Sequence, residues 1–304
     1  MKPKALKPGD TIQFVSPASS LTSDKTERIC ALLEGAGYRW KIAPHAFDAE
    51  GFLAGSDADR AADLQAAFAD PETDAVLCTR GGYGCARLFP YLDLRSIADS
   101  GKMFLGFSDI TTLHLALNRL GLATVHAPMA LTLNYDREPW VYDSFLRVLK
   151  GEAPIPDEAP AGTTMVGGSA EGELIGGCLC LLTDSIGTPL GLNTEGKLLL
   201  IEDVDENPHR IDAMLTHLVN SGLAAQAAGF VVGEMTRTDE RSDKDIGAKP
   251  WRAIVRDRLA PLGKPMVIDF PCGHAKAMLS LPLGIRARLD ADAGRLTYVE
   301  SLCA

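Results

Sequence analysis

The 304-residue sequence lacks the features that would place it in a membrane or on nucleic acid. No stretch approaches the roughly 18 uninterrupted apolar residues of a membrane span. The N-terminal MKPKALKPGDTIQFV is basic but has no apolar core of the signal-peptide type. The formal net charge is −10 and no long Lys/Arg block occurs, which argues against a nucleic-acid footprint. We therefore expect a cytoplasmic protein with no membrane and no nucleic-acid partner.

The sequence also lacks the patterns of metal and cofactor sites. Its seven cysteines are scattered and odd in number, so they are expected to be reduced and packed in apolar surroundings. Cys272 and His274 have no second ligand pair at zinc spacing. The acidic run 202–207 opens like a calcium loop, but Pro208 replaces the required glycine. No G-x-G-x-x-G follows the first expected strand. We expect no metal and no cofactor.

What is present is an ordinary globular composition, 46% hydrophobic and 23% charged, in a chain long enough for about two domains. In its first half, short apolar runs alternate with helical patterns. This alternation is typical of βαβ units and predicts a parallel sheet. The expected strands are Thr11–Ser16, Tyr38–Ala43, Ala75–Thr79, 103–107 and 122–127, and the expected helices are Lys25–Glu34, Asp57–Phe68, 109–120 and Pro139–Lys150.

The composition changes after residue 150. The segment 152–160 is rich in proline and acidic residues and cannot sustain a helix or a central strand. We interpret 151–164 as a linker between an α/β domain, 1–150, and a second domain, 165–304. The second domain has a less regular pattern, with expected strands at Lys197–Ile201, Gly229–Val232 and Pro265–Ile268, a helix at Pro208–Val219 and a closing hairpin of Leu283–Leu289 with Arg295–Val299.

Ser108 stands at the junction of an apolar run, Met103–Phe107, and an amphipathic helical stripe over 110–120. Two interpretations remain open for it. Its hydroxyl could cap the helix, as serine commonly does. Alternatively, the junction is a tight strand-to-helix turn that presents a serine nucleophile, with the next backbone N–H facing a developing oxyanion.

A serine nucleophile needs an imidazole base and a carboxylate that orients it. Among the six histidines, His274 stands out because the Gly/Pro-punctuated loop 270–276 directly follows an expected strand. Glu202 follows the apolar strand Lys197–Ile201, where an acid is also commonly a solvated strand end. Gly81 and Gly82 suit close approach of the backbone to a ligand, or simply form a flexible turn.

Four sequence blocks occur in the order and spacing of the LD-carboxypeptidase family of serine peptidases, which the chain resembles over nearly its whole length. The resemblance implies an α/β fold, with an N-terminal parallel-sheet α/β domain and a smaller β-rich α+β C-terminal domain. The blocks are Arg80–Gly84, Gly106–Asp109, Leu199–Asp203 with Pro208–Asp212, and Gly273–Ala275; Val15–Ala18 and Leu174–Gly177 also match.

The resemblance also implies the roles of the site residues. The family triad maps onto Ser108 as nucleophile, His274 as base and Glu202 as the orienting acid. Oxyanion donors map onto the backbone amides of Asp109 and Gly82. The Gly-x-Ser-Asp block lacks the second glycine of G-x-S-x-G, which argues against an ordinary α/β-hydrolase.

The function implied is release of the terminal D-alanine from a murein tetrapeptide during peptidoglycan recycling. The free carboxylate of such a substrate calls for an arginine, and Arg80 and Arg210 are the candidates, although either could instead form a structural ion pair. Two alternatives are a microcin-immunity-type hydrolase of aminoacyl-nucleotide antibiotics and a non-catalytic muropeptide-binding protein. The three tryptophans lie outside the site motifs, which favours a peptide over a nucleotide. A homodimer is compatible with the sequence.

Overall fold

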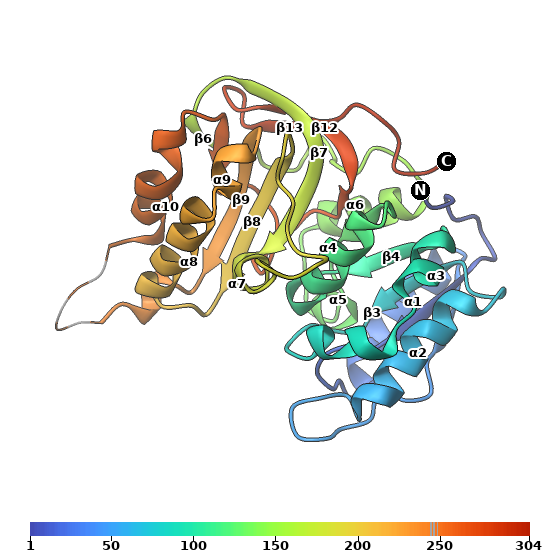
Figure 1. The fold of residues 1–304 in the computed structure, drawn as a ribbon. Helices are drawn as coiled ribbons and strands as arrows, with labels where there is room; N and C mark the ends of the chain where they lie inside the picture. Colours follow the sequence, from blue (N-terminus) through green and yellow to red (C-terminus); the bar gives the residue numbers. More distant parts are fainter. Residues whose placement is uncertain (244, 246, 248) are drawn as a thin grey trace. The chain divides into compact units, whose positions relative to one another are not determined.

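The computed structural model describes residues 1–243, 245, 247 and 249–304 and divides the chain into two compact units. The first unit comprises Met1–Pro156, Leu279–Leu283 and Ser301–Ala304, and the second comprises Asp157–Met278 and Gly284–Glu300 (Figure 1). Within the part of the chain that is described, no helix is both long and apolar enough to cross a membrane.

The first unit is built on a six-stranded sheet with the order β11-β5-β4-β3-β1-β2. The strands from β5 to β2 are parallel, and β11 is antiparallel to β5. The central strands are fully buried, as expected of a parallel sheet covered on both faces. The strands are β1 (Thr11–Val15), β2 (Arg39–Ile42), β3 (Ala75–Cys78), β4 (Met103–Gly106), β5 (Thr124–His126) and β11 (Leu281–Leu283).

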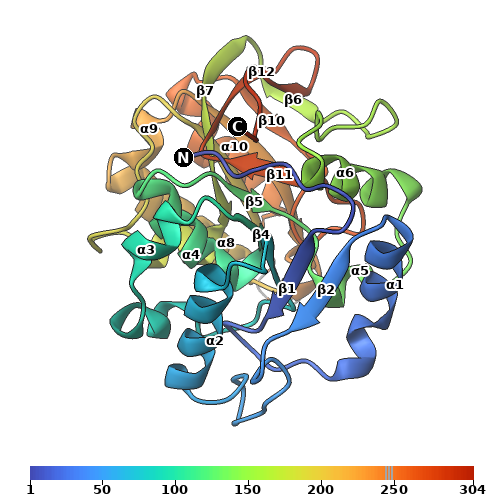
Figure 2. The ribbon, with the colours of Figure 1, turned by 90° about the vertical axis from the view of Figure 1, so that its right-hand side faces the viewer.

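Helices cover both faces of this sheet, which confirms the α/β fold expected from the alternation (Figure 2). One face carries α2 (Asp57–Ala69), α3 (Leu94–Asp99) and α4 (Thr111–Arg119). The other carries α1 (Glu27–Gly35), α5 (Ala130–Leu133) and α6 (Pro139–Leu149). Short 3-10 helices lie at η1 (Ser23–Thr26), η2 (Cys85–Tyr91) and η3 (Ser108–Ile110).

The second unit contains a seven-stranded mixed sheet with the order β13-β12-β7-β8-β9-β10-β6. Strands β7 to β10 are parallel, and the other strands pair antiparallel with their neighbours. The strands are β6 (Thr163–Val166), β7 (Ser169–Cys178), β8 (Leu198–Val204), β9 (Gly229–Thr236), β10 (Met266–Ile268), β12 (Ile285–Asp290) and β13 (Arg295–Tyr298).

Helix α8 packs against α7, α9 and α10, and Figure 1 shows α8 and α10 side by side over β8 and β9. The amphipathic pattern of α8 explains this packing, because its apolar residues from 211 to 218 are buried. The helices of this unit are α7 (Leu179–Asp184), α8 (Pro208–Asn220), α9 (Leu223–Gln226), α10 (Trp251–Leu259), η4 (Asp239–Arg241) and η5 (Ala260–Leu262).

The C-terminal part of the chain differs from the expected division at residue 165. The closing hairpin is present as β12 and β13, but the single strand expected over 283–289 is two strands. Gly284, with φ 74°, separates β11 from β12, and β11 pairs with β5 of the first unit. This long-range pairing has no local signature. The change of unit after Pro156 falls inside the segment 151–164 that was interpreted as a linker.

Candidate active site

Ser108 follows β4 after a single residue and begins the 3-10 helix that leads into α4. Its φ is 66°, in the left-handed region that residues other than glycine rarely adopt. The cap positions of η3 and α4 are Phe107 and Ile110. The interpretation of Ser108 as a helix cap is therefore wrong, because Ser108 is at neither cap position. A strained serine on a strand-to-helix turn is typical of a nucleophile elbow.

The glycine loop after β3 lies directly against this serine. A Cβ placed on Gly81 would be 2.7 Å from the Ser108 Cβ and 2.8 Å from its Oγ, so no larger residue fits there without displacement. Gly82 has φ 119°, and its Cβ would be 2.7 Å from the Ser19 Cβ. The glycines are thus required by close packing, and the loop is more than a flexible turn.

Asp109 ties the same loop to the turn that carries the serine. Its buried carboxylate Oδ2 accepts a hydrogen bond from the Cys85 backbone N–H at 2.8 Å. An aspartate in the Gly-x-Ser-Asp block thus has a structural role that glycine cannot fill. Ser108, Asp109 and Gly82 all lie in the first unit, and Gly81 is the glycine whose Cβ would meet Ser108.

In the second unit, Glu202 and His274 form a hydrogen-bonded pair. Glu202 lies on β8 and is fully buried, which excludes the solvated strand end. Its Oε2 is 2.7 Å from His274 Nδ1 and accepts the His274 backbone N–H at 3.1 Å. Because a carboxylate only accepts, Nδ1 carries a hydrogen, and in the neutral imidazole the lone pair is then on Nε2. This is the tautomer that a general base requires.

The surroundings of the pair favour a cationic imidazole. Burial lowers the pKa of His274, but the negative charge of Glu202 and its hydrogen bond outweigh burial, so the net pKa is raised above its ordinary 6.5. Gly273, with φ 81°, brings the backbone against Glu202; a Cβ at this position would overlap the Glu202 side chain.

The two candidate arginines have different environments. Arg80 donates to the carbonyl oxygens of Gly81 at 3.2 Å and Ser20 at 3.3 Å, and no acidic side chain pairs with it among the residues described. Arg210 is exposed on α8, with its Nε 3.9 Å from Glu206. Arg80 therefore lies beside the glycine loop without an acidic partner for its charge, whereas Arg210 forms a weak surface ion pair with Glu206.

Two residues of this region were not singled out from the sequence. Ser19 supports the glycine loop, because its Oγ accepts the Tyr83 N–H at 3.3 Å. Asp203, next to Glu202, is buried, and burial together with the nearby Glu202 charge raises its pKa to about 7. Ser19 lies in the loop that follows β1, where no supporting residue was predicted from the sequence. Asp203 was considered only within the rejected calcium loop and as the last residue of the block Leu199–Asp203, without a role of its own.

Comparison with known proteins assigns the chain to a family. The family model described as the LD-carboxypeptidase N-terminal domain matches residues 12–127, and that of the LD-carboxypeptidase C-terminal domain matches residues 171–289. The chain belongs to the LD-carboxypeptidase family.

Individual family members are similar over nearly the full length. A Bacillus subtilis protein named "Probable murein peptide carboxypeptidase" is 37% identical over 295 residues, which covers 95% of this chain and 91% of the relative. The muramoyltetrapeptide carboxypeptidase structure from Oxalobacter formigenes has a TM-score of 0.81 and 28% identity, and covers 94% of this chain and 97% of that one. The microcin C7 self-immunity protein MccF shares the fold, with a TM-score of 0.87, 21% identity and complete coverage of both chains.

Proposed function

We propose that this chain is a cytoplasmic serine-type LD-carboxypeptidase that releases the terminal D-alanine from a murein tetrapeptide, with Ser108, His274 and Glu202 as its triad. The observation that carries the proposal is the 2.7 Å hydrogen bond between His274 Nδ1 and the buried Glu202 carboxylate. The left-handed backbone of Ser108 supports the same role for the serine. Membership of the family supplies the reaction class.

In the proposed reaction, His274 Nε2 takes the proton of the Ser108 hydroxyl as the oxygen attacks the carbonyl of the scissile bond. The same proton then passes to the leaving amine of D-alanine. Water, activated by His274, hydrolyses the acyl-enzyme and restores the serine. Glu202 fixes the imidazole tautomer and stabilises its cation, a role supported by the two hydrogen bonds that its Oε2 accepts from His274.

The oxyanion is assigned to the backbone N–H groups of Asp109 and Gly82. Their placement is supported by the packing of the glycine loop on Ser108 and by the Asp109–Cys85 hydrogen bond. Loss of one such donor typically lowers the rate by about 100–1000-fold. Both donors are backbone groups, so no side chain supplies the hydrogen bond. Their position depends on the packing of the glycine loop and on Ser19, which supports that loop.

The experiment that tests this function measures kcat/KM by mass spectrometry for four substrates: the murein tetrapeptide, the pentapeptide with a further D-alanine, the all-L tetrapeptide and an aminoacyl sulfamoyl adenylate. We expect cleavage of the tetrapeptide and at least ~1000-fold lower values for the pentapeptide and the all-L peptide, because a buried charge left without its partner costs several kcal/mol. Ser108→Ala is the inactive control. Faster hydrolysis of the adenylate would assign the chain to the microcin-immunity type.

Arg80 is proposed to bind the substrate carboxylate, since it lies beside the nucleophile loop and pairs with no acid among the residues described. Arg80→Gln should raise KM for the tetrapeptide by roughly 10–100-fold, the loss of a charge-assisted hydrogen bond. It should change KM little for the C-terminal amide, which lacks the charge. Arg210→Gln is the matched control, and an equal effect of both variants would contradict the assignment to Arg80.

A further inference from the structure

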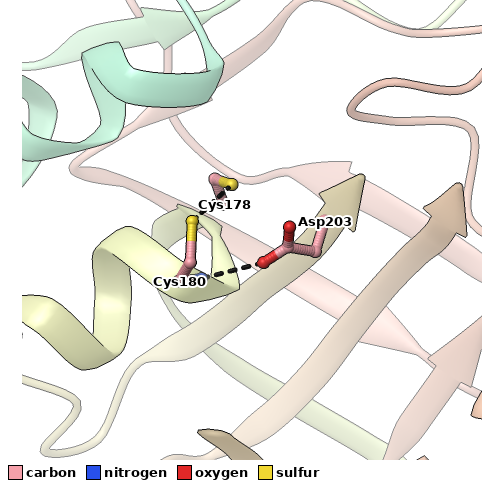
Figure 3. A group of neighbouring side chains, drawn as sticks. All are labelled: Cys178, Cys180 and Asp203. Atoms are coloured by element: carbon pink, nitrogen blue, oxygen red, sulfur yellow. Dashed lines mark hydrogen bonds between the residues drawn. The ribbon is translucent and has the colours of Figure 1, made fainter. Parts of the chain in front are cut away.

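Two cysteines and an aspartate meet where β7, α7 and β8 come together in the second unit (Figure 3). Cys178 is the last residue of β7, Cys180 lies in the first turn of α7, and Asp203 lies on β8. The two Sγ atoms are 3.4 Å apart. One ligand atom from each of the three residues lies within 4.8 Å of the other two.

This spacing matches the coordination shell of a thiophilic metal ion. Zinc binds thiolate sulfur at about 2.3 Å and carboxylate oxygen at about 2.0–2.2 Å, so two sulfurs of a tetrahedral site lie about 3.8 Å apart. The observed separation of 3.4 Å between the sulfurs needs an increase of only a few tenths of an ångström, which a small side-chain rotation supplies. The carboxylate oxygen lies within 4.8 Å of both sulfurs, whereas a tetrahedral shell requires about 3.6 Å, so the Asp203 and cysteine side chains must also close in on the ion.

The carboxylate of Asp203 is held in place for such a contact. Its Oδ2 accepts the Cys180 backbone N–H at 2.8 Å (Figure 3), and its Oδ1 accepts the Val204 N–H at 2.7 Å. Each carboxylate oxygen has two lone pairs, so each keeps one for a metal ion. Hydrogen bonds of this kind orient the ligands of natural metal sites.

Burial and donor type define which ion would bind. Cys178 and Asp203 are 3% and 1% exposed, whereas Cys180 is only half-buried and gives solvent access to the group. Two sulfurs and one carboxylate select zinc, cadmium or similar soft ions over magnesium and calcium, which prefer oxygen ligands. Glu202 is paired in register with Cys178 and directly precedes Asp203, but it is not part of the group.

We propose that Cys178, Cys180 and Asp203 form a site for one thiophilic divalent cation, with Zn²⁺ as the ion and Cd²⁺ as its spectroscopic substitute. Binding replaces the two thiol protons by two metal–sulfur bonds and releases both protons to solvent. Solvent completes the coordination. None of its three residues is a member of the proposed triad.

The experiment titrates the full-length, phosphine-reduced chain with Cd²⁺ and follows the ultraviolet thiolate-to-cadmium charge-transfer absorbance. We expect saturation at one ion per chain, with release of two protons in weakly buffered solution. Cys180→Ser and Cys178→Ser should each abolish most of the absorbance. Asp203→Asn should weaken binding by at least roughly 10–100-fold, which is the loss typical of removing only a supporting group. Cys303→Ser, in the first unit, is the matched control.

Circular dichroism of each variant identifies any that fails to fold, and the half-buried Cys180 is the substitution best tolerated on structural grounds. Absorbance that persists in both cysteine variants would overturn the proposal, as would the absence of saturable absorbance in the unmodified chain. An Asp203→Asn chain with unchanged affinity would refute the three-ligand site. None of these readouts uses peptide turnover, so the proposed peptidase activity is tested separately.

Discussion

Ser108, the proposed nucleophile, has an unfavourable backbone conformation. At φ 66° a serine is strained relative to glycine by about 1–2 kcal/mol, and the surrounding packing must offset this cost. Its position is decided by neighbours, because Gly81 packs against both its Cβ and its Oγ. A strained residue held by close contacts is the expected form of a preorganised nucleophile.

Two substitutions of Ser108 separate strain from catalysis. Ser108→Ala removes only the hydroxyl, so its free energy of unfolding should change by no more than about 1 kcal/mol. Ser108→Gly also relieves the left-handed strain and should be more stable than the alanine variant by about 1 kcal/mol. Both should lose turnover. Urea unfolding and peptide assays measure the two effects, and substantial activity in either variant would rule out Ser108 as nucleophile.

The raised pKa of His274 predicts the acid side of the pH profile. His274 must be neutral to accept the serine proton, so kcat/KM should fall as the pH drops through a value above the ordinary histidine pKa of 6.5. Glu202→Gln removes the charge that stabilises the imidazolium. It should therefore move this limb to lower pH and lower kcat by about 100–10,000-fold. An acid limb unmoved by Glu202→Gln would show that another group controls it.

The raised pKa of His274 also affects the free energy of unfolding, and its effect on stability has the opposite pH dependence to its effect on activity. A histidine whose pKa is raised by folding stabilises the fold fully at pH below 6.5, and this contribution is lost as the pH rises through the raised value. Activity and this part of the stability therefore change in opposite directions over the same pH range.

At the scale of elements, the functional residues of each unit gather at the ends of parallel strands. The glycine loop follows β3, and Ser108 follows β4, its neighbour in the sheet. In the second unit, Glu202 lies near the end of β8, and Cys178 ends the adjacent β7. Carboxyl ends of parallel strands share one edge, which is where open α/β sheets bind ligands.

The close packing of the glycine loop on Ser108 can be tested by a substitution in the loop itself. Gly81→Ala would place its Cβ 2.7 Å from the Ser108 Cβ, so the loop must shift away from the serine. We expect kcat/KM to fall by about 100-fold or more, the effect of a misplacement of about 1 Å. Gly35→Ala, at the end of α1, meets nothing within 4 Å and should be fully active. Similar activity of the two variants would contradict the packing argument.

At the scale of the whole molecule, the chain leaves the first unit after Pro156 and returns to it twice. Leu279–Leu283 contributes β11, which pairs with β5 as an edge strand of the first sheet. The first unit thus depends on residues far from it in the sequence. The stability of the first unit should therefore respond to changes at residue 281. In the sequence, this residue comes after every strand of the second sheet except β12 and β13.

Leu281→Ala tests this dependence. Leu281 is fully buried in β11, and loss of such a side chain typically costs about 2–5 kcal/mol. We expect faster hydrogen exchange in β5 and β4 of the first unit. Arg288→Ala, on the exposed face of β12, should change stability by less than about 0.5 kcal/mol. Unchanged protection of β5 in the Leu281 variant would show that β11 does not support the first sheet.

The sequence by itself determined the alternating α/β part of the fold, the hairpin at the C-terminus and the family. These rest on local information: apolar periodicity, turn residues and short blocks such as Gly106–Asp109. The same local information identified Ser108 and His274 as candidates, but it left both a cap and a nucleophile open for Ser108, because a serine before a helix fits both.

Only the tertiary structure removed the helix-cap interpretation of Ser108 and the solvated strand end of Glu202. The positive φ of Ser108 and its close approach to Gly81 are features of the folded chain, and the burial of Glu202 arises from its place in the middle of a sheet. Neither the pairing of β11 with β5 nor the meeting of Asp203 with two cysteines has a local signal, since each joins residues more than twenty positions apart. Contacts of this kind are selected by the burial of whole faces, which no window of the sequence contains.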